Sequence, residues 1–264
     1  MFNRLTRSVD GVAIAYSVSG TAETAMVLIH GGLCDRSFWD GQHGPFSDNF
    51  RVIALDLAGH GESGRDRQKW GVAEFAHDVL AVIDEERVPN AILVGNSLGG
   101  VVAIETALLA GTRAVGVIGV DTFQDLGRRI DPRQAKEQAD AWRRDFDGTL
   151  DRALGALFHP DAAPSLVADV RRRMSRTPVE VVWAMFSSLA GYDTAAPARQ
   201  LRVPVRCING DLYPTDTNAI RKFLTDFDAV VLPHTGHFPM LERPDEFNQR
   251  LAELMTAPNF KPRK

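Results

Sequence analysis

Residues 91–99 read Ala-Ile-Leu-Val-Gly-Asn-Ser-Leu-Gly, and this stretch decides the fold. The four apolar residues at its start are typical of a buried strand, and residues 98–110 are typical of a helix. Between the two lies a G-x-S-x-G pattern, in which Gly95 and Gly99 allow a sharp turn and a close backbone approach. The pattern predicts a nucleophile elbow, a tight strand-to-helix turn that lifts Ser97 off the end of a sheet.

Short apolar strands alternate with helical segments on both sides of this turn. Such alternation indicates a largely parallel sheet that is covered on both faces. The expected strands are residues 12–17, 25–29, 51–55, 91–95, 114–120, 203–208 and 229–232. The expected helices around them are residues 72–87, 98–110, 218–226 and 244–255.

The alternation is interrupted after Asp121. Residues 124–198 contain no convincing strand, and prolines divide them into helical stretches at 134–146, 150–158, 165–173 and 179–189. The sequence therefore predicts a core made of residues 1–123 and 199–264 and a helical cap made of residues 124–198.

Composition and charge exclude several classes of protein. The chain has 264 residues and a net charge of −4, so no general attraction to nucleic acid or to anionic membranes is expected. It has no apolar run long enough to span a membrane and no signal-peptide pattern at its start. Its two cysteines, Cys34 and Cys207, form no C-x-x-C motif. We expect a cytoplasmic protein, and its oligomeric state stays open.

A serine becomes a good nucleophile only with a base in hydrogen-bond reach and an acid that orients the base. The expected base is His237, in the loop Gly-His-Phe-Pro that follows strand 229–232 and precedes the last helix. Its rival, His234, is expected to line the loop or to hydrogen-bond backbone.

In these motifs the chain resembles the α/β-hydrolase superfamily over nearly its whole length. The motifs that carry the resemblance are His-Gly-Gly at 30–32, Asp-Leu-Ala-Gly-His-Gly-Glu-Ser at 56–63, the elbow at 95–99 and Gly-His-Phe-Pro-Met-Leu-Glu at 236–242. The resemblance implies a mostly parallel eight-stranded sheet flanked by helices, with the cap inserted after strand 6.

The same resemblance implies roles for single residues. Ser97 would be the nucleophile and His237 the base. The backbone N–H groups of Leu98 and Gly32 would form the oxyanion hole, because two convergent donors stabilise a tetrahedral oxyanion. His30 would brace the oxyanion loop, and a structural role is also expected for His60.

The position of the acid departs from the usual pattern of the superfamily. Most members place it three residues after the glycine that ends strand 7, and counting from Gly210 gives Tyr213, which cannot serve. A minority, including haloalkane dehalogenases, place the acid at the end of strand 6, where this chain has Asp121. We expect Asp121 to be the acid, with Asp211 as the alternative and Asp216 as a further candidate.

Bulky residues of the cap are expected to line the substrate pocket. The leading candidates are Trp142 and Trp183, and the others are Phe146, Phe158, Met185 and Phe186. No metal site is expected, because His43, His77 and His159 have no partners at ligand spacing, and no cofactor is implied.

The expected function is hydrolysis of small, fairly apolar carboxylic esters through an acyl-enzyme. Two alternatives use the same fold and nucleophile: a lactonase, and a carbon–carbon bond hydrolase, whose members often have a similar Gly-Asn-Ser-Met-Gly elbow. A third alternative belongs to another class: a ligand receptor or non-catalytic interaction protein on a hydrolase scaffold.

Overall fold

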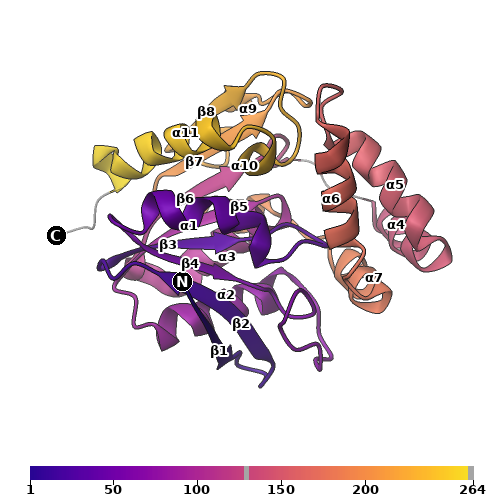
Figure 1. The fold of residues 1–264 in the computed structure, drawn as a ribbon, viewed down its shortest axis with the longest axis horizontal. Coiled ribbons are helices and arrows are strands. Elements are labelled where there is room, and N and C mark those ends of the chain that lie inside the picture. Colours follow the sequence, from indigo (N-terminus) through magenta and orange to yellow (C-terminus); the bar gives the residue numbers. More distant parts are fainter. Residues whose placement is uncertain (128–130, 261–264) are drawn as a thin grey trace.

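One mixed sheet of eight strands forms the centre of the molecule (Figure 1). The computed structural model describes residues 1–127 and 131–260. The strand order is β1-β2-β4-β3-β5-β6-β7-β8; β2 is antiparallel to β1 and β4, and every pair from β4 to β8 is parallel. The strands are β1 (Phe2–Arg7), β2 (Ala13–Ser19), β3 (Thr24–Ile29), β4 (Arg51–Leu55), β5 (Asn90–Asn96), β6 (Ala114–Val120), β7 (Val205–Gly210) and β8 (Phe227–Leu232).

Helices cover the sheet on both faces. Two of them, α2 (Val72–Glu85) and α3 (Leu98–Ala110), pack against each other, while α1 (Asp40–Phe46) contacts α11 (Pro244–Thr256) in the other layer. The short helices of this part are η1 (Arg36–Trp39), η2 (Gly111–Arg113), α9 (Thr217–Ile220), α10 (Pro239–Glu242) and η3 (Pro258–Phe260).

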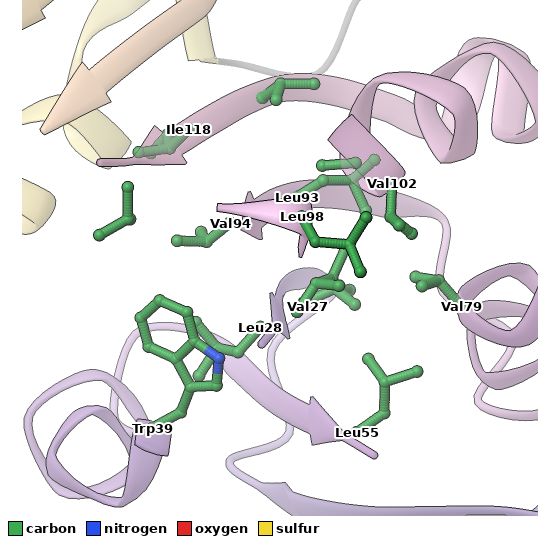
Figure 2. Packing of buried hydrophobic residues seen from close by; sticks show 14 of the residues in the cluster. Val27, Leu28, Trp39, Leu55, Val79, Leu93, Val94, Leu98, Val102 and Ile118 are labelled. Atoms are coloured by element: carbon green, nitrogen blue, oxygen red, sulfur yellow. The ribbon is translucent and has the colours of Figure 1, made fainter. Parts of the chain in front are cut away.

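The central strands are apolar along their whole length because both of their faces are buried. Figure 2 shows Leu93 of β5 on the side of Val102 and Val79, whereas the next residue, Val94, lies on the side of Trp39. Successive side chains of a strand point to opposite faces, so a strand covered on both sides needs no polar alternation. The fully apolar strand pattern in the sequence is thereby explained.

A helical segment joins β6 to β7, as the sequence predicts. Its helices are α4 (Pro132–Arg144), α5 (Phe146–Leu157), α6 (Pro164–Met174), α7 (Val179–Ser188) and α8 (Ala195–Ala198). The first four gather at one end of the molecule, on the right in Figure 1, away from the layers that flank the sheet. The predicted fold, an α/β-hydrolase fold with a helical insertion after strand 6, is confirmed.

Several elements differ from the prediction, among them helix α1 (Asp40–Phe46), which is not one of the expected helices. The edge strand β1 was not among the expected strands, because its side chains are mostly exposed and show no apolar alternation. The helix expected over residues 218–226 ends at Ile220, and β8 already begins at Phe227. Within the described residues, no helix combines the length and the apolar character that a membrane span requires.

Candidate active site

The turn between β5 and α3 holds Ser97 in a rare backbone conformation. Its φ is +53°, in the left-handed region that non-glycine residues seldom adopt. The neighbouring glycines make this turn possible: a Cβ on Gly95 would lie 2.1 Å from the carbonyl oxygen of Gly99, and one on Gly99 would lie 2.3 Å from that of Ile29. Such strain is a feature of nucleophile elbows, where it exposes the serine hydroxyl.

His237 is paired with a buried carboxylate. Its Nδ1 lies 2.6 Å from Oδ2 of Asp121, which is only 5% exposed at the end of β6. The other oxygen of Asp121 accepts from the backbone N–H of Gly210 and from Nε2 of Gln124, both at 3.0 Å. With both oxygens occupied, the carboxylate is fixed, and its bond to Nδ1 directs Nε2 of His237 away from it.

Asp211 and Asp216 have other partners. The carboxylate of Asp211 accepts from the backbone N–H groups of His234 and Thr235, at 2.8 and 3.0 Å, and these bonds lower its pKa. Asp216 caps α9 by accepting from Ala219. Asp211 therefore stabilises a turn and Asp216 the start of a helix, and the geometry favours Asp121 as the partner of the histidine.

Asn96 links the segments that carry the three candidate residues. Its side chain is fully buried, and its Nδ2 donates to the carbonyl oxygens of Val120 and His237, at 2.9 and 3.0 Å. These bonds tie the residue before Ser97 to the end of β6 and to the loop between β8 and α10. This loop carries His237 and is called the histidine loop below. The sequence analysis assigns Asn96 no role of its own, although it is the first of the two variable residues of the G-x-S-x-G pattern.

The loop after β3 is braced by a buried histidine, as the sequence predicts. Nδ1 of His30 donates to the carbonyl of Gly31 at 2.7 Å, and its Nε2 accepts from the backbone of Leu57 at 3.0 Å. Burial lowers the pKa of His30 to about 4, so the ring is neutral near pH 7. This bracing fixes the backbone that leads to Gly32.

One apolar cavity of about 470 Å³ connects these elements. Ser97, His237, Gly32 and Leu98 all line it. Most of its other lining residues come from the helical insertion and are Trp142, Ala153, Leu157, Met174, Met185, Phe186, Leu189, Tyr192 and Thr194. The insertion therefore forms much of the wall of the cavity that contains the candidate nucleophile.

The predicted pocket residues of the insertion divide into two groups. Trp142 stacks on Phe186, with ring centroids 5.5 Å apart and planes 9° from parallel, and both line the cavity together with Met185. Phe146 packs on Trp142, and Phe158 packs on Phe238. Phe146 and Phe158 thus pack against residues that line the cavity and are not themselves in the lining.

Trp183, the other leading candidate for the pocket, contacts residues of α4. Its Nε1 donates to Asp140 at 2.9 Å, and the guanidinium of Arg143 lies 3.5 Å from its ring centroid. These contacts hold the indole against α4, outside the set of residues that line the cavity.

Sequence reasoning also missed a cluster of possible metal ligands. His159, Asp161 and His234 each place one ligand atom within 4.8 Å of the others. The nearest signal in the sequence is the His-x-Asp spacing at 159–161, which is too short a pattern to indicate a site on its own. Its third member lies more than seventy residues away, and only the fold brings it close.

Comparisons with known proteins identify the family of the chain. A family model described as alpha/beta hydrolase family matches residues 26–250. The chain belongs to this family. This alpha/beta hydrolase is 27% identical over 241 residues to a pimeloyl-[acyl-carrier protein] methyl ester esterase of Nitrosospira multiformis, covering 84% of the chain and 90% of the relative. It is 29% identical over 262 residues to the dihydrolipoyllysine-residue acetyltransferase component of an acetoin cleaving system of Pseudomonas putida. That alignment covers 91% of the chain but only 65% of the relative's length.

A solved structure of the same fold is a thermophilic esterase from Thermogutta terrifontis. It superposes on this alpha/beta hydrolase with a TM-score of 0.84 at 24% identity, covering 97% of the chain and 98% of the esterase. The likeness confirms the fold, and the substrate has to be argued from the cavity.

Proposed function

We propose that this hydrolase cleaves small, uncharged, largely apolar carboxylic esters through an acyl-enzyme, with Ser97, His237 and Asp121 as its triad. The observation that carries the proposal is the 2.6 Å contact between His237 and the buried carboxylate of Asp121, beside a cavity that Ser97 and His237 both line. A nucleophile, a base and an orienting acid are the three groups that acyl transfer requires.

In the first half of the proposed reaction, Oγ of Ser97 attacks the ester carbonyl while Nε2 of His237 takes the hydroxyl proton. The carbonyl oxygen becomes an oxyanion, which the N–H groups of Leu98 and Gly32 stabilise. The tetrahedral intermediate then breaks its bond to the alkoxy oxygen. His237 returns the proton to that oxygen, so the alcohol leaves and the acyl group stays on Ser97.

In the second half, water attacks the acyl-enzyme and His237 takes one of its protons. The new tetrahedral intermediate releases the carboxylic acid, and the proton on His237 returns to Ser97. Asp121 stabilises the imidazolium in both halves and holds the tautomer with its proton on Nδ1. A lactone would be opened by the same steps, with the alcohol remaining attached to the product.

The lining of the cavity supports the choice of substrate class. Among the described residues, the cavity lining contains no aspartate, glutamate, lysine or arginine, and aromatic, aliphatic and thioether groups dominate. A charged substrate group would lose its hydration there without gaining a partner. A volume of about 470 Å³ lies within the range of small-molecule sites.

We further propose that residues 124–198 act as a cap that sets substrate choice, on a core of residues 1–123 and 199–264. Supporting this division, α4–α8 all lie between β6 and β7, and residues of this segment form much of the cavity wall.

The test is hydrolysis of p-nitrophenyl esters of increasing acyl length by the purified protein and its Ser97→Ala variant. We expect turnover of neutral esters by the wild type and a loss of about 10⁴-fold or more in the variant. Neutral lactones and vinylogous diketones assayed in parallel distinguish ester, lactone and carbon–carbon cleavage. Binding without turnover of any of them would instead indicate a receptor.

A further inference from the structure

His159, Asp161 and His234 form a cluster at the junction of the helical insertion and the sheet layer. His159 and Asp161 follow α5, and His234 lies in the loop between β8 and α10. Oδ2 of Asp161 lies 3.4 Å from Nδ1 of His159 and 3.1 Å from Nδ1 of His234. The two imidazole rings lie 5.3 Å apart and nearly perpendicular, at 78°.

These separations suit a tetrahedral ion. Zinc binds imidazole nitrogen and carboxylate oxygen at about 2.0–2.2 Å, so two of its tetrahedral ligand atoms lie about 3.3–3.5 Å apart. The two nitrogen–oxygen distances in the cluster are within about 0.2 Å of that range. We propose that His159, Asp161 and His234 bind one divalent transition-metal ion, with water as the fourth ligand, and that this ion ties the helical insertion to the histidine loop.

Backbone groups contact both histidines. His234 has a φ of +52°, and its N–H is held by Asp211 at 2.8 Å, which fixes where its side chain starts. The N–H of Asp161 donates to Nδ1 of His159 at 3.2 Å. This bond uses the lone pair of Nδ1, so an ion bound at that nitrogen would take the place of the hydrogen bond.

The donor set selects the kind of ion. Two imidazole nitrogens and one carboxylate oxygen suit Zn²⁺, Ni²⁺, Co²⁺ and Cu²⁺. Mg²⁺ and Ca²⁺ prefer shells of oxygen ligands, so they should bind poorly. About two thirds of the His234 side chain is exposed, which leaves room for an ion to enter and for water to complete its coordination.

The proposed metal site lies beside a hydrogen bond that already joins the helical insertion to the histidine loop. The backbone N–H of His237 donates to the carbonyl of Leu157 at 2.7 Å, and a Cβ on Gly236 would lie 2.4 Å from that same oxygen. An ion held by His159 and His234 would add a second link next to this contact. Its ligands are not members of the Ser97–His237–Asp121 group, so turnover should persist in metal-free protein.

The experiment is thermal unfolding of chelator-stripped wild-type protein with added Zn²⁺, Ni²⁺ or Mg²⁺. A site filled at about 100 times its Kd should raise the Tm by about 5 °C, whereas Mg²⁺ should leave it unchanged. Calorimetric titration should give one Zn²⁺ per chain, and Co²⁺ should give the intense visible bands of a tetrahedral site. Ester turnover should survive stripping, and the binding measurements stand whether or not an ester is cleaved.

Three variants locate the site, and a fourth is their control. His234→Ala, His159→Gln and Asp161→Asn should each lose the Zn²⁺-dependent rise in Tm. Asp147→Asn, which removes an exposed carboxylate of α5 that pairs with Arg171, should keep it. If His234→Ala fails to fold, the loss of the Zn²⁺-dependent rise in Tm is tested with His159→Gln instead. Absence of Zn²⁺ binding up to ~1 mM, or equal binding by wild type and all three variants, would overturn the proposal.

Discussion

Replacing Asp121 with asparagine would change the tautomer of His237 while leaving the shape of the site intact. In the wild type, one carboxylate oxygen accepts from the fixed backbone N–H of Gly210 and from Gln124, and the other accepts from His237. The amide oxygen of an asparagine must keep the bond to Gly210, because a backbone donor cannot turn away. The amide NH₂ then faces Nδ1 of His237, which must become an acceptor.

This change should be costly because the ring proton moves to Nε2. His237 can then no longer take the proton of Ser97. We expect kcat to fall about 10³- to 10⁴-fold with little change in KM, as in other triads that lose the charge of the acid. At about 1.36 kcal/mol per factor of ten, this loss corresponds to about 4–5.5 kcal/mol of transition-state stabilisation.

The assay is the initial rate of p-nitrophenyl ester hydrolysis over a range of substrate concentrations, with circular dichroism to verify folding. Asp211→Asn is the matched control: it also removes one carboxylate near the histidine loop, but that carboxylate bonds to the backbone of His234 and Thr235. It should retain a rate near that of the wild type. If Asp211→Asn loses activity while Asp121→Asn keeps it, the assignment of Asp121 as the acid is refuted. If both variants stay active, Asp216 is the next residue to test.

Three further predictions concern the surroundings of the triad. Asn96→Ala removes the donor to the carbonyl of His237, so kcat should fall about 10- to 100-fold with KM nearly unchanged; a proportional rise in KM instead would contradict a positioning role. Trp142→Ala opens the cavity wall and should raise kcat/KM for long relative to short acyl chains by about tenfold, whereas Trp183→Ala should leave that ratio unchanged. Burial lowers the pKa of His60 to about 3, so the unfolded chain binds a proton below pH 6.5 that the folded chain does not. Urea titrations should therefore show the free energy of unfolding falling by about 2 kcal/mol from pH 7 to pH 5 through this residue, and His60→Gln should lose that part of the fall.

The sequence predicts elements well where local physical signals agree. Prolines and apolar periodicity place the helix expected at 179–189 within one residue of α7 (Val179–Ser188). Buried parallel strands are predicted equally well, because a short apolar run without alternation is typical of a strand that is covered on both faces. By contrast, β1 (Phe2–Arg7) is held by pairing with β2 while its side chains stay mostly exposed, so no apolar pattern marks it.

The site is predictable only in part, because side-chain direction depends on tertiary packing. Trp142 and Trp183 both lie on helices of the insertion, yet one faces the cavity and the other packs on Arg143. Which side of each helix meets the core cannot be read from composition. The bond between Asn96 and His237 is another case, since it joins residues that are 141 positions apart in the sequence.

Covalent labelling of Ser97 tests the central claim most directly. A fluorophosphonate probe reacts with a serine only when a base and an oxyanion hole activate it. We predict one adduct per wild-type chain by intact mass, located at Ser97 by peptide mapping, and no adduct in Ser97→Ala. A wild-type chain that stays unlabelled while folded, or that is labelled at another residue, would contradict the account.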